Sequence, residues 1–269
     1  MNIKQICSQA SATTERFERE LLLTHALNQP RAYLYSHPEK ELSQTEFELF
    51  NQLLQRREQG EPIAYILGET EFYSLKFYIT PAVLIPRPET ELLIDYVLEN
   101  FKQKKLCMWE LGTGSGIISV TLARHRPDWD ITATDISEEA LDVAKKNAHF
   151  HKAHNIKFIK SNWYEGLDSA KADLIISNPP YVAENDTHLN ELRFEPSLAL
   201  ISGKEGMDAI KTIIQEAKTH LKSNGWVLLE HGYDQAKWVQ NSFRENQFSE
   251  IKTMDDLNHH PRMTIAKNV

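Results

Sequence analysis

The apolar side chains from Glu15 to about Gln59 follow a helical pattern. The clearest series at helical spacing is Phe17, Leu21, Leu22 and His25. This series stops at residues 28–30, where Asn-Gln-Pro interrupts it, and a short helix is expected over residues 31–36. Ser43 then opens a further helix with the spacing of a capping box, and the segment ends at residues 60–62. The pattern predicts a small helical domain over residues 1–65.

Beyond this domain the pattern changes twice. Residues 66–85 are rich in β-forming side chains interrupted by Gly68 and Pro81, which predicts a β-hairpin linker. Residues 86–269 alternate apolar runs of strand length with longer helical stretches. Strands are expected at residues 106–111, 130–135, 156–160, 172–177, 226–231, 248–254 and 262–267. Helices are expected at residues 89–101, 115–125, 138–150, 206–221 and 233–245.

Such alternation is typical of an α/β domain with a mostly parallel sheet and helices on both faces. The last two strands lack an intervening helix, so they are expected to pair antiparallel. Ligands of these sheets bind at the carboxyl ends of the strands. Functional side chains are therefore expected directly after the strands.

A glycine-rich turn follows the first strand of this region. Its residues are Gly112, Thr113, Gly114, Ser115 and Gly116. Glycines between a strand and a helix let the backbone approach a ligand at the helix N-terminus. The spacing differs from the Gly-x-Gly-x-x-Gly of dinucleotide folds, and there is no Walker lysine. Asp135 ends the next strand, where it is placed to accept hydrogen bonds from two ribose hydroxyls or to cap the helix starting near Ser137. The two roles are compatible, and we favour the ligand role.

The sequence Asn178-Pro179-Pro180-Tyr181 follows the apolar strand 172–177. Two consecutive prolines fix their φ angles and remove two N–H donors, which makes a stiff turn with outward carbonyls. The Asn178 side-chain oxygen and the Pro179 carbonyl are suited to accept the two hydrogens of a planar NH2 group. The Tyr181 ring is suited to cover the flat face of that group. The turn therefore predicts a clamp for an amide or an exocyclic amine.

Together, the stretch Glu110–Gly116 and the clamp resemble a class I methyltransferase that uses S-adenosylmethionine. The resemblance narrows to the release-factor glutamine N5-methyltransferases through four further stretches. They are Leu84–Glu91, Arg193–Pro196, Leu229–Gly232, and Asp256-Leu257 with Arg262. The resemblance implies a Rossmann-like seven-stranded sheet with an antiparallel C-terminal strand in the catalytic domain over residues 86–269. It also implies a role for the helical domain in substrate recognition.

Carried over residue by residue, the resemblance assigns a cofactor site and a catalytic site. The expected cofactor-binding residues are Gly112, Thr113, Gly114, Ser115, Gly116, Asp135 for the ribose, Trp163 beside the adenine, and Asn178. The expected catalytic residues are Asn178, Pro179, Pro180 and Tyr181, which would hold the glutamine amide. The implied substrates are class I peptide-chain release factors, methylated at the glutamine of their Gly-Gly-Gln motif, with S-adenosylhomocysteine as the second product. Glu110 stands where the family often has aspartate, and Asn162 stands where an acid is common.

The composition narrows the possible partners and compartments. A formal net charge of −8 disfavours extended contact with nucleic-acid backbones, so no direct nucleic-acid binding is expected. The two cysteines, Cys7 and Cys107, are far apart, and the eleven histidines form no evident ligand cluster, so no metal site is expected. The N-terminus has no signal-peptide layout and no apolar run is long enough for a bilayer, so a cytoplasmic protein is expected.

Several alternatives remain open at this point. An adenine-N6 methyltransferase of DNA or RNA would use the same clamp, and a glutamine methyltransferase of a ribosomal protein would share almost every motif. A non-catalytic binding module is disfavoured by the intact Asn178 and Pro179. The long polar loop 182–205 is suited to close over a substrate. Glu195 and His231 are conceivable proton acceptors, although a structural role is favoured for both.

Overall fold

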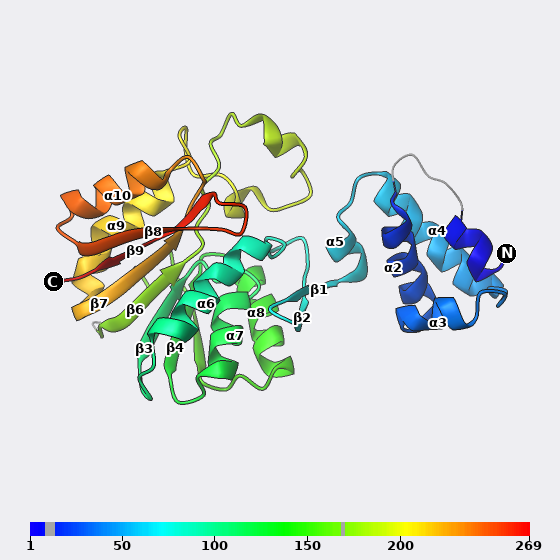
Figure 1. Cartoon of the computed structure of the whole chain (residues 1–269), viewed down its shortest axis with the longest axis horizontal. Coiled ribbons are helices and arrows are strands. Elements are labelled where there is room, and N and C mark those ends of the chain that lie inside the picture. Colours follow the sequence, from blue (N-terminus) through cyan, green and yellow to red (C-terminus); the bar gives the residue numbers. More distant parts are fainter. Residues whose placement is uncertain (9–13, 168–169) are drawn as a thin grey trace. The chain divides into compact units, whose positions relative to one another are not determined.

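The computed structural model describes residues 1–8, 14–167 and 170–269. The chain forms two compact units, Met1–Glu69 and Thr70–Val269, which are shown in Figure 1. Residues 9–13, within the predicted helical domain, lie outside the described part.

The first unit consists of helices, as the sequence predicts. Its elements are α1 (Ile3–Ser8), α2 (Arg16–Leu27), α3 (Arg31–Ser36), α4 (Gln44–Glu58) and α5 (Ile63–Leu67). The capping box of α4 is present, because the Ser43 hydroxyl accepts from the Glu46 N–H and the Glu46 carboxylate accepts from the Ser43 N–H at 2.7 Å. The short helices α1 and α5 were not predicted, because each has fewer than two turns and no repeated apolar spacing. The equally short α3 was predicted from the break at residues 28–30 that precedes it.

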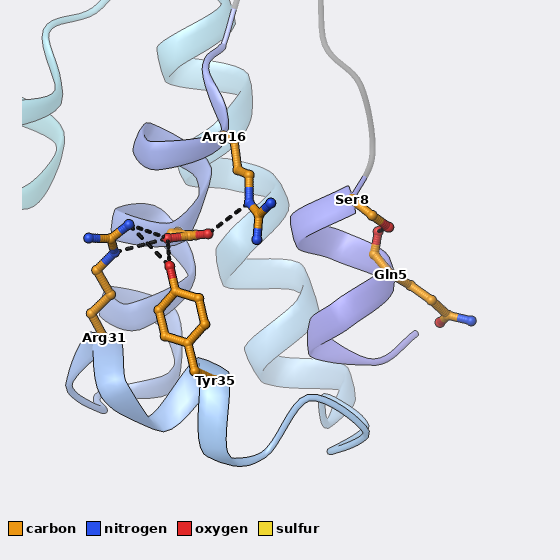
Figure 2. Close-up of polar contacts among 6 residues, drawn as sticks. Gln5, Ser8, Arg16, Arg31 and Tyr35 are labelled. Carbon is orange, nitrogen blue, oxygen red and sulfur yellow. Dashed lines mark hydrogen bonds and ion pairs between the residues drawn. The ribbon is translucent and has the colours of Figure 1, made fainter.

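A buried carboxylate joins α2 to α3 in this unit. Glu20 is 2% exposed and accepts hydrogen bonds from Arg16 Nε at 3.0 Å, from Arg31 Nη2 at 2.7 Å and from the Tyr35 hydroxyl at 2.7 Å. Figure 2 shows the side chains of Arg16, Arg31 and Tyr35 turned toward this one group. The contacts neutralise the carboxylate and fix α3 against α2, where leucines such as Leu22 and Leu23 form the unit's core.

The hairpin is shorter than the predicted linker of residues 66–85. Ile66 and Leu67 complete α5, and Gly68 ends that helix in the left-handed region at φ 73°. The strands β1 (Glu69–Phe72) and β2 (Leu75–Tyr78) follow, joined by two residues with positive φ, which is the geometry that tight hairpins favour. Ile66 was placed at the start of the predicted linker, but its side chain is buried in the helical core instead.

The second unit contains a seven-stranded sheet in the order β5-β4-β3-β6-β7-β9-β8. The strands are β3 (Cys107–Leu111), β4 (Asp130–Asp135), β5 (Ile156–Lys160), β6 (Ala172–Ser177), β7 (Leu221–Glu230), β8 (Ser249–Asp255) and β9 (Pro261–Lys267). The helices are η1 (Pro88–Thr90), α6 (Glu91–Asn100), α7 (Ile117–His125), α8 (Glu138–Phe150), η2 (Thr187–Asn190), η3 (Ser197–Ala199), α9 (Asp208–His220) and α10 (Ala236–Glu245). β9 pairs antiparallel with both β7 and β8, and the strands from β3 to β7 pair in parallel, which confirms the predicted α/β fold.

The strand order places helices on both faces of the sheet. The chain runs from β3 to β4 and β5 in one direction, and then from β6 to β7 in the other. Because such crossovers are right-handed, α7 and α8 lie on one face and α9 on the opposite face. On the latter face, isoleucines of α9 such as Ile210 and Ile213 pack against Val227 and Leu229 of β7. The direction reverses between β3 and β6, and ligands of such folds bind at this point.

The strand β7 begins five residues before the predicted start at residue 226. Leu221 pairs with Ala172 of β6 directly after α9 ends at His220. Asn224, with φ 63°, and Gly225 then accompany a register shift in the ladder. Asn and Gly are residue types that favour turns, but here the strand continues through them with an irregularity.

Candidate active site

A cavity of about 760 Å³ lies at the reversal point of the sheet. Of the predicted site residues, those that line it are Gly112, Thr113, Gly114, Ser115, Asp135, Trp163, Asn178 and Pro180. Gly116, Pro179 and Tyr181 are their neighbours along the chain but do not line the cavity. The remaining wall includes Arg87 from the segment before α6 and Pro196 and Leu198 from the long loop. Segments widely separated in sequence thus meet around one space.

The glycine-rich turn is fixed by its own backbone. The Thr113 N–H donates to the Thr134 carbonyl at 2.8 Å, and the Gly114 N–H donates to Asp135 Oδ2 at 2.8 Å. Gly116 adopts φ 81° at the start of α7, and a Cβ there would lie 3.1 Å from the Ala144 Cβ on α8. Gly116 therefore serves the close approach of α7 and α8, while Gly112 to Ser115 form the cavity wall.

Asp135 ends β4 and uses both carboxylate oxygens within the protein. Oδ2 accepts from Gly114, and Oδ1 accepts the Ser137 N–H at 2.9 Å. Ser137 itself caps α8, because its hydroxyl accepts the Ala140 N–H at 3.1 Å. Burial raises the pKa of Asp135, although backbone hydrogen bonds oppose this effect. Each carboxylate oxygen retains a further lone pair, so Asp135 can organise the turn and still accept ligand hydroxyls.

Glu110 is buried at the end of β3, and the groups that donate hydrogen bonds to it are uncharged. Its Oε2 accepts the Thr113 hydroxyl at 2.7 Å and the Ser119 N–H at 3.0 Å, and it is 1% exposed. Burial raises the pKa of Glu110 to about 7, while the bonds from Thr113 and Ser119 lower it. The carboxyl group thus ties the end of β3 to the first turn of α7, and it also lines the cavity.

Trp163 and Gly112 form one corner of the cavity. Trp163 has φ 50°, a conformation that bulky residues rarely adopt, which indicates a constrained position. The Trp163 ring lies 3.4 Å from the place of a Cβ on Gly112, so a side chain at Gly112 would meet the ring. The adjacent Asn162 also lines the cavity, and its amide donates to Glu165 at 3.0 Å.

The clamp residues have different surroundings. Asn178 follows β6, lines the cavity and donates from Nδ2 to the Thr90 hydroxyl at 3.1 Å. Pro179 is buried, and Pro180 lines the cavity. Tyr181 packs against the core on the α9 face, and its hydroxyl lies 3.5 Å from Glu230 Oε1. Burial, followed by the charge of Glu230, raises the pKa of Tyr181.

Thr90 and Glu230 lie beside the clamp and within two of the stretches that carry the family resemblance, but the sequence analysis assigned neither of them a role in the site. They are 0% and 1% exposed and contact Asn178 and Tyr181 respectively. Glu230 directly follows an apolar run at the carboxyl end of a strand, which is the signal that identified Asp135 and Asn178. Thr90 carries no such signal, because it lies in the short turn η1 before α6.

The loop after the clamp is closed at its base and anchored near its middle. The Val182 N–H donates to the Leu200 carbonyl at 2.8 Å, and the Ser202 N–H donates to the Val182 carbonyl at 2.9 Å. Glu195 accepts from Arg87 Nη2 at 2.6 Å and from the Ile85 N–H at 3.1 Å. These contacts give Glu195 the structural role that we favoured.

His231 is also held in structural contacts. Its ring is 0% exposed, with Nδ1 2.9 Å from the Gly232 carbonyl and Nε2 2.8 Å from the Thr264 hydroxyl. Because a carbonyl only accepts, Nδ1 carries the proton and Nε2 accepts from Thr264. Burial lowers the pKa of His231, which keeps the ring neutral.

Across residues 1–8, 14–167 and 170–269, no three His, Cys, Asp or Glu side chains gather as a metal site would require. In the same part of the chain, no helix has the length and apolar character needed to cross a membrane.

Comparison with known proteins identifies the family. Residues 2–68 match the PrmC N-terminal domain, and residues 88–193 match the methyltransferase small domain. A release factor glutamine methyltransferase of Coxiella burnetii is 43% identical over 267 residues, which cover 99% of this chain and 96% of that protein. The chain belongs to the release factor glutamine methyltransferase family. Another release factor glutamine methyltransferase, from Shewanella oneidensis, is 40% identical over 96% of this chain and 91% of its own length.

Solved structures agree with the fold of a release factor glutamine methyltransferase. A methyltransferase from Pyrococcus furiosus superposes with a TM-score of 0.57 over 81% of this chain and 100% of its own, at 20% identity. At that identity the likeness concerns the fold alone. Membership of the family makes the protein an enzyme, a methyltransferase, and argues against a non-catalytic binding module.

Proposed function

We propose that the protein transfers the methyl group of S-adenosylmethionine to the side-chain amide nitrogen of the glutamine in the Gly-Gly-Gln motif of class I release factors. The observation that carries the proposal is the position of Asn178 in the wall of the same cavity as the glycine-rich turn. The relatives named release factor glutamine methyltransferase, which align with nearly the whole chain, support the substrate. They favour it over a ribosomal protein and over adenine in DNA or RNA.

The residues around the cavity fit S-adenosylmethionine. Asp135 offers a carboxylate for ribose hydroxyls, Trp163 offers an aromatic surface for adenine, and Gly112 to Ser115 offer a wall with small side chains. A cavity of about 760 Å³ lies within the range of cofactor-sized sites. When bound, the cofactor supplies a methyl group already activated by its sulfonium.

The protein's own part in the reaction is to position the amide nitrogen. An amide nitrogen is a weak nucleophile, because its lone pair is delocalised into the carbonyl. Asn178 Nδ2 donates to Thr90, which leaves Oδ1 to accept one hydrogen of the substrate NH2. The Pro179 carbonyl is proposed to accept the other hydrogen. Two fixed acceptors would orient the nitrogen and stabilise the positive charge that develops on it.

Mass spectrometry of a class I release factor tests this proposal. Wild-type protein with S-adenosylmethionine should add one methyl group to the Gly-Gly-Gln glutamine, and Asn178→Ala should lower the rate by roughly a hundredfold or more. Asn185→Ala, in the exposed part of the loop after the clamp, should act as wild type and serves as the control. An unmodified release factor together with methylated adenine in RNA or DNA would overturn the substrate assignment.

The cofactor assignment has its own test by calorimetry. Asp135→Ala should weaken the binding of S-adenosylmethionine by about 1–3 kcal/mol, the usual cost of leaving polar partners unpaired. Asp142→Ala provides the control, because Asp142 is an exposed carboxylate on α8 whose partner is Lys145. Equal affinity in Asp135→Ala and wild type would remove Asp135 from the cofactor site.

A further inference from the structure

Gln235 is a buried amide that the chemistry above leaves without a role. It directly precedes α10 and is 5% exposed. Its Oε1 accepts the Gly232 N–H at 2.9 Å. Its Nε2 donates to the Tyr181 carbonyl at 3.0 Å and to the Gly206 carbonyl at 3.2 Å. The oxygen and both hydrogens of the amide are therefore used, which makes this side chain a fixed point of the second unit.

The two carbonyls that Gln235 holds stand at the two ends of the loop 182–205. Tyr181 directly precedes this loop and Gly206 directly follows it. Gly206 has φ 73°, and a Cβ there would collide with the Tyr181 carbonyl, so the two ends of the loop touch. The loop contributes Pro196 and Leu198 to the cavity wall. A single buried side chain thus fixes both ends of a segment that lines the cavity.

The chemistry of its partners determines the orientation of the Gln235 amide. The Gly232 N–H can only donate, so the amide oxygen must face it. The two carbonyls can only accept, so they require the NH2 group. A rotated amide would direct its oxygen at both carbonyls and its hydrogens at the Gly232 N–H. The contacts therefore depend on the NH2 group of glutamine and not only on the volume of its side chain.

These contacts fix the clamp at its second end. At the first end, Ser177 is paired with strands on both sides, because β6 lies between β3 and β7 in the sheet. Two prolines leave the backbone between the ends few soft torsion angles. At the second end, Gln235 holds the Tyr181 carbonyl. Asn178 and the Pro179 carbonyl, the two proposed acceptors, lie between these fixed points.

We infer that Gln235 is a positioning residue, which holds the end of the clamp and the base of the loop so that Asn178 and Pro179 meet the substrate amide in one geometry. The inference rests on the proposed function of these two residues as acceptors for that amide. It assigns Gln235 no contact with substrate or cofactor, because Gln235 is not among the described residues that line the cavity. Its effect on the reaction passes through the backbone of Tyr181.

Kinetics of Gln235→Glu provide the first test. The variant keeps the size of the side chain and an acceptor for Gly232, but directs an oxygen at the two carbonyls. It should lower kcat roughly 10- to 100-fold, both for release factor and for a short Gly-Gly-Gln peptide, and leave the affinity for S-adenosylmethionine unchanged. Asn241→Asp makes the same chemical change at an exposed position of α10 and is the control. A loss confined to whole release factor, or a variant that no longer binds cofactor, would overturn the inference in favour of a docking role or a role in the fold.

The pH dependence of the variants provides the second test. The carboxyl group of Gln235→Glu lies out of water beside two carbonyls, which raises its pKa above the ordinary value of about 4.3. Once protonated, it can donate one hydrogen to one of the two carbonyls. Its kcat relative to wild type should therefore rise as the pH decreases from about 9 to about 6. Gln235→Met has no donor at any pH and should keep a constant low ratio. The same pH profile for both variants would overturn the inference.

The wild-type protein gives a readout that needs neither substrate nor a folded variant. Because both hydrogens of the Gln235 amide are buried and bonded, they should exchange with D2O roughly a hundredfold or more slowly than those of Gln52, an exposed residue of α4. NMR spectra of the full-length protein measure this difference. Exchange as fast as that of Gln52 would overturn the inference even if release factor is methylated. A release factor left unmethylated, with slow exchange at Gln235, would instead contradict the proposed function.

Discussion

Arg87 and Glu195 form an ion pair of 2.6 Å between two segments that line the cavity. Glu195 is 8% exposed and also accepts the Ile85 N–H at 3.1 Å, so both of its oxygens are used. The pair joins the segment before α6 to the loop that follows the clamp, and the next loop residue, Pro196, lies in the cavity wall. The ion pair therefore fixes part of the cavity wall.

Loss of this ion pair should impair the use of the protein substrate. Glu195→Ala leaves the Arg87 guanidinium and the Ile85 N–H without their partner and releases the loop from the cavity wall. We expect kcat/KM for release factor to fall roughly tenfold or more, because positioning of the substrate is lost. Glu191→Ala removes an exposed carboxylate from the same loop and should have little effect. Steady-state kinetics that cannot distinguish the two variants would contradict this role of the pair.

The sequence was sufficient to place the glycine-rich turn, Asp135 and Asn178 at one edge of the sheet. Each follows an apolar run of strand length, and the carboxyl ends of parallel strands share an edge. Local patterns therefore predicted the strands, their direction and the side chains at their ends. The same rule, applied to the apolar run before Glu230, would have identified that residue as well.

Contacts between distant segments could not be predicted in this way. Arg87 and Glu195 are separated by 108 positions, and Thr90 and Asn178 by 88. No periodicity relates such pairs, because they meet only once the sheet and its crossovers have formed. The Tyr181 ring shows the same limit, since its packing against the α9 face depends on neighbours that a local pattern does not contain.

Two glycines of the glycine-rich turn should differ in their sensitivity to alanine. Gly114 has φ 54° with no atom within 4 Å of an added Cβ, so Gly114→Ala should cost only the backbone penalty of about 1–2 kcal/mol. Gly116 has φ 81°, and its Cβ would lie 3.1 Å from Ala144, so overpacking adds about 1–3 kcal/mol more. Urea unfolding followed by tryptophan fluorescence measures the difference, because all five tryptophans lie in the second unit. Equal free energies of unfolding for Gly114→Ala and Gly116→Ala would show that α7 and α8 can move apart without loss of stability.

Glu110 should make the second unit less stable as the pH rises. Its pKa in the folded protein is about 7, against an ordinary value of 4.5. Below pH 4.5 the Glu110 carboxyl group is protonated in both the folded and the unfolded state. Between the two values the unfolded state loses the proton first, so the free energy of unfolding decreases until the folded state also ionises near pH 7. The contribution should amount to about 2–3 kcal/mol between pH 4.5 and pH 8.

Glu110→Gln isolates this contribution. Glutamine keeps an acceptor for Thr113 and Ser119 but has no charge to lose, so the variant should gain stability relative to wild type as the pH is raised from 5 to 8. Urea unfolding at a series of pH values, again followed by tryptophan fluorescence, gives the comparison. Parallel curves for the two proteins would mean that Glu110 is not protonated in the folded state at neutral pH.

The helical unit is expected to recognise the release factor and to be dispensable for cofactor binding. All residues that line the cavity lie at or beyond Ala82, so a chain that begins at Thr70 retains the complete wall. This shortened chain should bind S-adenosylmethionine with unchanged affinity in calorimetry. It should methylate whole release factor at least a hundredfold more slowly than the full chain, since most of the recognition surface would be missing.

A short peptide containing Gly-Gly-Gln separates recognition from catalysis in this experiment. The peptide can reach the cavity but is too small to engage a separate surface, so the full and shortened chains should methylate it at the same slow rate. Equal rates on whole release factor would contradict a recognition role for the helical unit. If the shortened chain binds no cofactor and lacks a cooperative unfolding transition, the helices are needed for the fold of the second unit, and recognition must then be tested by substitutions on their surface.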